Sequence, residues 1–258
     1  MSALGGRHAL VTGGGRGIGA AIVSALAAAG ARITLAGRDG AALNAHAATL
    51  PASAGALAVA CDVTDDASVA AAFEAARARH GEIAILVNNA GASLSAPFVT
   101  LEREAWDAML AVNLTSAYTC ARAALPAMVA AQWGRIVNVA STAGLVGGAY
   151  IAAYSAAKHG VVGLTRSLAV EFARKGITVN AVCPGFTATA MLERAVDRIS
   201  ATTGRTPDAA ADALLARNPL KRFVRPDEVA DAVVWLCGEN ASAVNGQAIA
   251  IDGGEVQP

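Results

Sequence analysis

The chain has 258 residues, of which 55% are hydrophobic and only 16% are charged. This composition favours a large buried core and argues against disorder. Lysine plus arginine and aspartate plus glutamate number 20 each, so the formal net charge is zero. A balanced charge argues against a protein that works mainly through nucleic acid or an anionic membrane, and we expect neither as a partner.

The spacing of the cysteines gives no sign of a metal site. Cys61, Cys120, Cys183 and Cys237 are far apart and form neither a CxxC pair nor a cluster with histidine. We therefore expect reduced thiols in the core and no bound metal. The sequence also shows no signal peptide and no run of eighteen apolar residues, which predicts a cytoplasmic protein.

Short apolar runs alternate with helical stretches along the whole chain. The predicted strands are 8–12, 31–37, 56–63, 83–91, 134–141, 176–185 and 246–254. The predicted helices are 17–30, 41–50, a helix capped by Asp65 or Asp66 that runs to about His80, 102–131, 152–174 and 226–238. Because the strands are nearly continuous apolar runs, they indicate a parallel sheet covered on both faces. The right-handed crossover rule then predicts a seven-stranded, doubly wound α/β fold of the Rossmann type.

Two stretches break this rhythm. We expect the helical region 102–131 to be interrupted near Asn113 and to bend or be remodelled at Pro126. Residues 186–225 have no strand character and are too long for an ordinary connection, which predicts a lid. No linker or internal repeat is visible, so residues 1–258 are expected to form one domain.

The glycine-rich stretch TGGGRGIG lies between the first predicted strand and the first predicted helix. Glycines at Gly13, Gly17 and Gly19 let the backbone turn sharply and let a pyrophosphate approach the helix N-terminus, where free N–H groups favour anions. A glycine cluster alone can be only a turn. Its position at the first βα junction favours a dinucleotide-binding loop.

The end of the second predicted strand bears on which dinucleotide is bound. NAD-binding proteins place an acid there, roughly twenty residues after the glycines, to hold the ribose 2′-hydroxyl. This chain has Arg38 followed by Asp39, and Arg38 with Arg16 suits a 2′-phosphate. We therefore expect NADP(H), while NAD(H) stays open if Asp39 serves the ribose. A further alternative is that Arg38 is only a solvated turn residue.

Polar residues also end two other predicted strands. Asp62 follows ALAVAC, and Asn88 and Asn89 follow IAILV. In an open parallel sheet, ligands bind beyond the carboxyl ends of the strands, so these side chains are candidate ligand contacts. The alternative is that they only cap turns, which is the favoured interpretation for Asn89.

Ser141, Tyr154 and Lys158 can do chemistry together. Tyr154 and Lys158 are four residues apart and share a face of a predicted helix, while Ser141 lies at the end of a strand. A free tyrosine has a pKa of about 10, and we expect the lysine cation to lower it towards the range where proton transfer is efficient. The Ser141 hydroxyl opposite the phenol would hold a carbonyl or alcohol oxygen. Alone, the Tyr–Lys pair could be an ordinary surface pair.

The stretches TGGGRGIG, NNAG, YSAAK and PGFTAT, with Asn113 and Ser141, occur in the order and spacing of the short-chain dehydrogenase/reductase family, which the chain resembles over nearly its whole length. The resemblance implies catalytic roles for Ser141, Tyr154, Lys158 and Asn113, the last holding a relay water near Lys158. It implies cofactor contacts at Gly13, Arg16, Gly17, Ile18, Gly19, Arg38, Asp62, Val63, Asn88, Ala90, Gly91, Tyr154, Lys158, Pro184, Gly185, Thr187 and Thr189.

The expected substrate-binding residues are Ser141, Leu145, Tyr150, Tyr154, Phe186 and Met191. If the apolar residues among them face the site, the substrate is a medium-sized or long apolar ketone or alcohol. The sequence of residues 153–186 resembles that of 3-oxoacyl-(acyl-carrier-protein) reductases and, still more, that of polyketide ketoreductases. That resemblance implies a small-molecule or acyl-thioester substrate, and Arg194, Arg198 and Arg205 offer only a weak indication of a carrier phosphate.

The leading hypothesis is therefore NADPH-dependent reduction of a 3-oxoacyl or similar β-keto substrate. The first alternative is an NAD(P)-dependent secondary-alcohol or 3-hydroxyacyl dehydrogenase working in the oxidative direction. An alternative of another class is a cofactor-sensing protein without turnover. The resemblance also implies a homotetramer, paired through the helical regions 104–131 and 152–174 and through the C-terminal IDGG segment.

Overall fold

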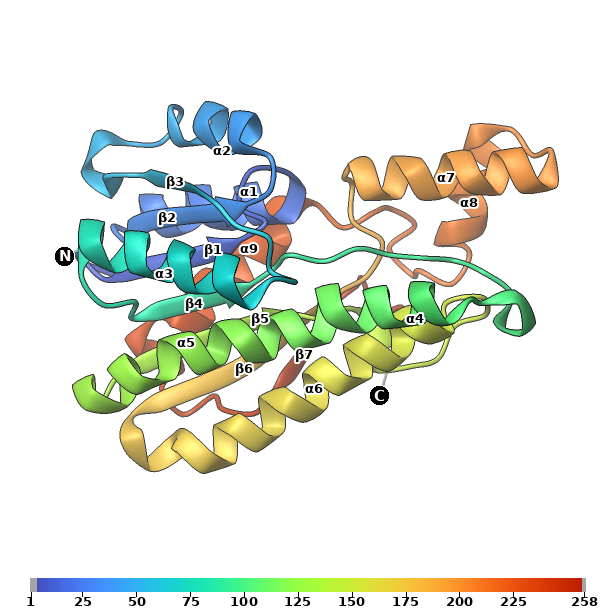
Figure 1. The fold of residues 1–258 in the computed structure, drawn as a ribbon. Coiled ribbons are helices and arrows are strands. Elements are labelled where there is room, and N and C mark those ends of the chain that lie inside the picture. The colour runs from blue at the N-terminus through green and yellow to red at the C-terminus, as the bar shows by residue number, and fades with distance from the viewer. Residues whose placement is uncertain (1–3, 257–258) are drawn as a thin grey trace.

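A computed structural model describes residues 4–256 as one parallel sheet covered by helices (Figure 1). The strands are β1 (His8–Thr12), β2 (Arg32–Gly37), β3 (Leu57–Ala60), β4 (Ile85–Asn88), β5 (Gly134–Val139), β6 (Ile177–Pro184) and β7 (Ala248–Ile251). They pair in the order β3-β2-β1-β4-β5-β6-β7, all parallel. The seven-stranded, doubly wound fold predicted from the sequence is confirmed.

The helices that pack on the sheet do so on both faces. They are α1 (Gly17–Ala28), α2 (Gly40–Ala47), α3 (Asp66–His80), α4 (Arg103–Leu110), α5 (Ser116–Ala131), α6 (Ala152–Phe172) and α9 (Pro226–Cys237). Alternate residues of β1 show the division: Ala9 and Val11 belong to the core under α1 and α9, whereas Leu10 belongs to the core under α3, α5 and α6. This two-sided burial explains why the strands are apolar throughout.

The strand order reverses beside β1, which pairs with β2 on one edge and with β4 on the other. In such a sheet the loops after β1 and β4 leave in opposite directions and open a crevice at the carboxyl edge, which is where ligands bind. β3 and β4 are shorter than predicted, because the polar residues beyond Ala60 and Asn88 belong to the loops of this edge.

The interruption predicted near Asn113 is a π-helical turn, Ala111–Thr115, between α4 and α5. α5 continues through Pro126 without interruption, so the proline does not break the helix. Pro126 lies on the exposed face of α5. Water can therefore take the backbone carbonyl that proline leaves without a hydrogen-bond donor.

Residues 186–225 form two helices, α7 (Ala190–Thr203) and α8 (Pro207–Leu215), which lie beyond one end of the sheet (Figure 1). None of the residues of α7 is buried. A single β-bridge, Thr187 with Val224, joins the two ends of the segment. The segment is thus held at its base while its helices stay largely outside the core.

All four cysteines are buried and carry free thiols. Among residues 4–256, no helix is both long enough and apolar enough to cross a membrane. The same part of the chain places no group of three or more His, Cys, Asp or Glu side chains so that they could hold a metal ion.

Candidate active site

The glycine loop lies at the carboxyl end of β1 and leads directly into α1. Arg16 is the N-cap residue of α1, yet no side chain caps the helix and no acidic residue lies in its first turn. The first N–H groups of α1 are therefore free to bind an anion. This end of the helix fits the pyrophosphate of a dinucleotide.

The loop is closely packed against the end of β4. A Cβ at Gly19 would overlap the carbonyl oxygen of Gly13, and Gly13 itself has φ = 66°. Asn89 donates its side-chain amide to the carbonyls of Thr12 (3.0 Å) and Gly13 (3.2 Å). The Thr12 hydroxyl in turn accepts from the backbone N–H groups of Asn89 and Ala90. Asn89 therefore has a structural role in the loop, which was the favoured interpretation from the sequence. Gly13 and Gly19 allow the close approach of the loop to the end of β4.

The end of β2 differs from the expected cluster of two arginines. Arg16 forms a 2.6 Å ion pair with Asp39. Asp39 also caps α2, accepting from the N–H of Ala42 at 3.0 Å. The convergence of Arg16 with Arg38 on one anion is not what the structure shows: the carboxylate of Asp39 attracts Arg16, and Arg38 remains exposed. The loop nevertheless keeps both guanidinium groups at the edge where the adenosine end of a dinucleotide would lie.

Asp62 follows β3 at the same edge of the sheet. Its carboxylate accepts hydrogen bonds from the hydroxyl (2.7 Å) and the N–H (2.9 Å) of Thr64. These bonds lower the pKa of Asp62, and the Arg38 charge adds to the effect. Asp62 is therefore an ionised acceptor, with Val63 buried behind it. Both residues follow β3 at the carboxyl edge of the sheet, where ligands of such sheets bind.

Asn113 lies inside the π-helical turn and is almost fully buried. Its amide nitrogen donates to the carbonyls of Ala92 (2.9 Å) and Met109 (3.0 Å), and its oxygen accepts from the Ala92 N–H at 3.3 Å. A Cβ at Gly91 would lie 2.7 Å from the Asn113 oxygen and 3.6 Å from Lys158 Nζ. Gly91 is thus the point where the β4 loop, Asn113 and Lys158 come together.

Ser141, Tyr154 and Lys158 converge from two elements. Ser141 caps a short 3-10 helix, Thr142–Gly144, and its hydroxyl accepts from the N–H of Ala143 at 3.1 Å. Tyr154 and Lys158 share one face of α6, and Lys158 is buried. Lys158 Nζ donates to the carbonyl of Val139 at 2.9 Å and lies 5.7 Å from the centre of the Tyr154 ring. The structure brings these three predicted residues and Asn113 into one site.

The expected lowering of the Tyr154 pKa is wrong for the protein described here. Burial raises the pKa of Tyr154, and only the nearby Ser141 hydroxyl opposes this. Burial also lowers the pKa of Lys158 to about 8. The physical reason is that desolvation penalises both charged forms, while the lysine is directed to the Val139 carbonyl rather than to the phenol. Tyr154 is therefore a neutral, protonated phenol at physiological pH.

The segment after β6 lies against the glycine loop. Gly185 donates to the carbonyl of Ile251, and the Thr187 hydroxyl donates back to the carbonyl of Gly185 at 3.0 Å. A Cβ at Gly17 would lie 3.2 Å from Thr189 Cγ2. Pro184 ends β6 beside this segment. The predicted contacts of this segment therefore meet the loop that starts α1, next to Ile18 on α1.

The predicted substrate residues other than Ser141 and Tyr154 differ in their exposure. Leu145 is half-buried, while Tyr150, Phe186 and Met191 are exposed. Tyr150 has φ = 65°, a conformation in which non-glycine residues are strained, and its carbonyl accepts from the N–H of Ala96 at 2.8 Å. That bond ties the loop after β4 to the loop that precedes α6.

The arginines suggested for a carrier phosphate lie on solvent-facing positions of the 186–225 segment. Arg194 and Arg198 are exposed on α7, whereas the neighbouring Leu192, Val196 and Ile199 are half-buried. The Nδ1–H of His159 donates to the carbonyl of Ser155 (2.9 Å), one turn back on α6, as a structural residue would.

Sequence analysis missed two backbone groups of the site, the carbonyls of Val139 and Ala92, which hold Lys158 and Asn113. Every residue carries such a carbonyl, so no signal in the sequence could have found them. The buried bond between the side chains of Asn138 and Thr165 was not predicted either.

Comparison with known proteins agrees with this geometry. The family model described as Enoyl-(Acyl carrier protein) reductase matches residues 13–255. The chain is 43% identical over 249 residues to a protein named as ketoacyl reductase 1 of the granaticin polyketide synthase of Streptomyces violaceoruber, covering 95% of this chain and 92% of the relative. It is 41% identical over 257 residues to D-beta-hydroxybutyrate dehydrogenase of Cupriavidus necator, covering 98% and 99%.

Among solved structures, a variant of the actinorhodin polyketide ketoreductase with NADPH superimposes with a TM-score of 0.92. The identity is 39%, and the match covers 96% of this chain and 97% of that protein. The relatives are named as dehydrogenases and ketoreductases, which interconvert hydroxyl and ketone groups with a nicotinamide cofactor. The chain belongs to the short-chain dehydrogenase/reductase family and is an oxidoreductase that acts on ketone and hydroxyl groups.

Proposed function

We propose that the protein reduces a ketone with NADPH, and that the substrate is a 3-oxoacyl or similar β-keto compound. The observation that carries the proposal is the Tyr154 phenol hydrogen-bonded to the Ser141 hydroxyl, with the Lys158 ammonium 5.7 Å from the centre of the ring. A protonated phenol is a proton donor, which is what the reductive direction needs. The oxidative direction requires the phenolate, which burial disfavours in the protein as described.

In this mechanism the nicotinamide, when bound, supplies the hydride. Ser141 donates a hydrogen bond to the substrate carbonyl oxygen, and Tyr154 transfers its proton to that oxygen as negative charge develops there. The electrostatic gain is largest at the transition state, because the oxygen is then most negative. Lys158 holds a positive charge behind the phenol, and Asn113 fixes the backbone at Ala92 beside it.

NADP(H) is favoured over NAD(H) by Arg38 at the end of β2 and by Arg16 in the glycine loop. A 2′-phosphate would meet Arg38 directly and would compete with Asp39 for Arg16, which is 76% exposed and free to move. The solved ketoreductase with NADPH supports the same choice. Asp39 leaves a role for NAD(H), because its carboxylate could hold a ribose 2′-hydroxyl instead.

The proposal of a β-keto substrate rests on the uncharged side chains predicted to bind the substrate and on the names of the relatives. Leu145, Tyr150, Phe186 and Met191 present no charge to a substrate. The granaticin and actinorhodin relatives are named as ketoacyl or polyketide ketoreductases. Together these features favour a neutral β-keto ester or thioester over a free acid. We expect the segment 186–225, whose helix α7 buries none of its residues, to act as the lid over this substrate.

The second candidate is a 3-hydroxyacyl dehydrogenase working with NAD(P) in the oxidative direction. The hydroxybutyrate dehydrogenase relative and the Arg16–Asp39 pair favour it. Steady-state turnover separates the two. Ethyl acetoacetate with NADPH should exceed acetoacetate with NADH and 3-hydroxybutyrate with NAD⁺. A strong preference for NADH would contradict the cofactor proposal, and faster turnover of the free acids would contradict the substrate proposal.

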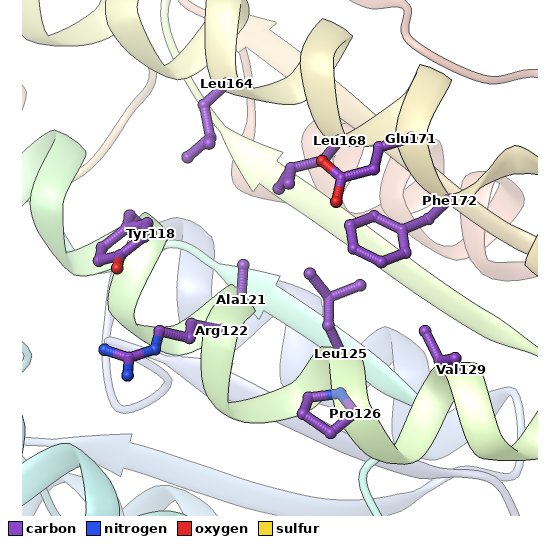
Figure 2. A pocket seen from close by; sticks show the side chains of 10 residues that line it. All are labelled: Tyr118, Ala121, Arg122, Leu125, Pro126, Val129, Leu164, Leu168, Glu171 and Phe172. Atoms are coloured by element: carbon purple, nitrogen blue, oxygen red, sulfur yellow. The ribbon is translucent and has the colours of Figure 1, made fainter.

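The assembly we propose is a homotetramer. A groove of about 420 Å³ runs between α5 and α6 (Figure 2). Its walls are lined by Tyr118, Ala121, Arg122, Leu125, Pro126, Val129, Leu164, Leu168, Glu171 and Phe172. A second copy related by a two-fold axis would cover this apolar groove and would bring Arg122 of one copy towards Glu171 of the other. The half-buried edge strand β7 and the exposed Trp235 offer a second two-fold contact.

Light scattering tests the assembly. Val170 on α6 is 83% exposed beside the groove residues Leu168 and Glu171, and Val99 is 92% exposed in the 3-10 helix Phe98–Thr100, which does not line the groove. Val170→Asp should reduce the particle mass, whereas Val99→Asp should leave it near four chains. A wild-type mass near one chain would contradict the proposal.

The four buried free thiols support a reducing compartment, such as the cytoplasm, as the place of action.

A further inference from the structure

A chain of buried hydrogen bonds joins β4, β5 and α6 beneath the active site. Asn88 Nδ2 donates to Asn138 Oδ1 at 2.8 Å, and Asn138 Nδ2 donates to Thr165 Oγ1 at 2.9 Å. Thr165 Oγ1 donates to the carbonyl of Val161 at 2.8 Å. The three side chains are 8%, 1% and 0% exposed. Water cannot substitute for these partners, so each bond matters more than it would at the surface.

The direction of this chain is set at its α6 end. A hydroxyl has one proton, and Thr165 gives it to the Val161 carbonyl. Thr165 can therefore only accept from Asn138, which must present its amide nitrogen to α6 and its oxygen to β4. Asn88 then has to donate to Asn138, and its own oxygen is left buried without a protein partner. One hydroxyl on α6 thus orients two asparagines.

The same stretch of β5 holds α6 at two points. Val139 accepts the ammonium of Lys158, and Asn138 donates to Thr165. Lys158 and Thr165 are seven residues apart, which is about two turns or roughly 10 Å along one face of the helix. Two anchors at this spacing fix both the rotation and the axial position of α6. Without Thr165, α6 would keep Lys158 and the Ser155 hydroxyl, which donates to the Ala143 carbonyl at 2.8 Å, but would lose its buried side-chain anchor two turns further along.

We propose that Asn138 and Thr165 are positioning residues for catalysis. They touch neither substrate nor the reacting atoms, and act by holding α6 so that Tyr154 stays opposite Ser141. Ser141 follows β5 and Tyr154 lies in the first turn of α6, so any shift of the helix relative to the strand changes the separation of the two hydroxyls. This inference needs only the reaction class, not the substrate or cofactor proposed above.

The test compares two threonines that are both fully buried and both hydrogen-bonded to a buried side chain, one beneath the active site and one far from it. Thr165→Val removes the acceptor of Asn138. Thr34→Val is the matched control, because Thr34 is also 0% exposed and bonds one buried side chain, His8, at 2.9 Å on the far part of the sheet. Both variants should lower the thermal midpoint. Only Thr165→Val should lower kcat, by about 10- to 100-fold, as expected for a small misplacement of a catalytic group.

Absorbance titration of tyrosine gives a readout that needs no substrate. The chain has three tyrosines, and Tyr118 and Tyr150 are 49% and 64% exposed. Tyr154 is therefore the one that ionises late, owing to its burial. In Thr165→Val the phenol of Tyr154 should ionise at lower pH than in the wild type, because a displaced α6 would let water reach it. In Thr34→Val the titration should match the wild type.

Thr165→Ser keeps the hydroxyl and should restore kcat, measured with NADPH and whichever neutral ketone the wild type reduces. If Thr165→Val does not fold, Thr165→Cys takes its place, because a thiol is a weak acceptor and should give an intermediate kcat and titration. The proposal is overturned if the variant that folds loses stability like Thr34→Val while kcat and the Tyr154 titration stay unchanged. Failure of the β-keto substrate alone would leave the titration result standing.

Discussion

Lys158 donates its ammonium to the carbonyl of Val139 at 2.9 Å, while the ring of Tyr154 lies 5.7 Å away. The lysine is thus held by the strand that carries Ser141, and burial keeps its pKa at about 8. Its charge is present below this pH and absent above it. The charge that assists the phenol is therefore under pH control.

The first prediction concerns the pH dependence of ketone reduction. kcat/KM should fall as pH rises through about 8, because Lys158 then loses the proton that stabilises developing negative charge. A profile from pH 6 to 10 checks this. Lys175→Met changes an exposed lysine beyond the end of α6 and should leave the profile unchanged. A wild-type profile that stays flat to pH 10 would contradict the role of Lys158.

Replacing Tyr154 by Phe should remove the proton donor without removing the ring. We expect kcat to fall by about 10²- to 10⁴-fold and cofactor affinity to change little. Tyr118→Phe is the control, since Tyr118 lies on α5 in the groove away from the site. Unchanged behaviour of Tyr154→Phe would favour a cofactor-sensing protein over an enzyme.

Asp39→Asn should increase the preference for NADPH over NADH. The change keeps the cap of α2 but removes the charge that binds Arg16, so Arg16 becomes available to a 2′-phosphate. One charge-assisted hydrogen bond corresponds to a shift of about 10-fold or more in the ratio of kcat/KM values. Asp65→Asn changes the equivalent cap of α3 and should not alter the ratio. A fall in the NADPH preference of Asp39→Asn would show that Arg16 does not serve the phosphate.

Gly91→Ala should reduce activity through Asn113. The new methyl group would lie 2.7 Å from the Asn113 oxygen, so the asparagine or the loop must move. A misplacement of this kind costs about 10- to 100-fold in kcat. Gly163→Ala is the contrasting change, because a Cβ there meets nothing within 4 Å inside α6. It should stabilise the protein by about 0.5–1 kcal/mol and leave kcat intact. Equal kinetics for the two variants would refute the argument.

Acid stability should depend on His8, which is buried at the far edge of the sheet from the site. Burial lowers the pKa of His8 from 6.5 to about 4, and His80 packs against it with ring centres 5.1 Å apart. Between pH 6.5 and 4, His8 binds a proton in the unfolded chain but stays neutral in the folded protein. Stability is therefore present above pH 6.5 and is lost as the pH falls, by about 3 kcal/mol for this group.

Urea unfolding at pH 7 and at pH 4.5 measures this loss. His8→Gln should be less stable at pH 7, because the new side chain cannot reproduce the bonds to Thr34 and Gly81. It should nevertheless lose less stability than the wild type between the two pH values. An equally steep loss in both proteins would assign the acid sensitivity to other groups.

The sequence by itself determined the fold and predicted four residues that the structure brings into one site. Continuous apolar strands between helices require a sheet covered on both faces, and the glycines after β1 require a close turn, because both are local consequences of side-chain size and polarity. Asn113, Ser141, Tyr154 and Lys158 were predicted as catalytic residues because their chemistry is rare and their order along the chain is typical of the family.

Tertiary structure decided what depends on burial and on partners distant in sequence. The Tyr154 pKa is raised rather than lowered, because desolvation outweighs a lysine that points to Val139. Arg16 pairs with Asp39 across 23 positions, which no local pattern reveals. The anchoring of α6 by Asn138 is equally hidden. Electrostatic effects and buried hydrogen bonds depend on three-dimensional distance and solvent exclusion, and those quantities exist only once the chain has folded.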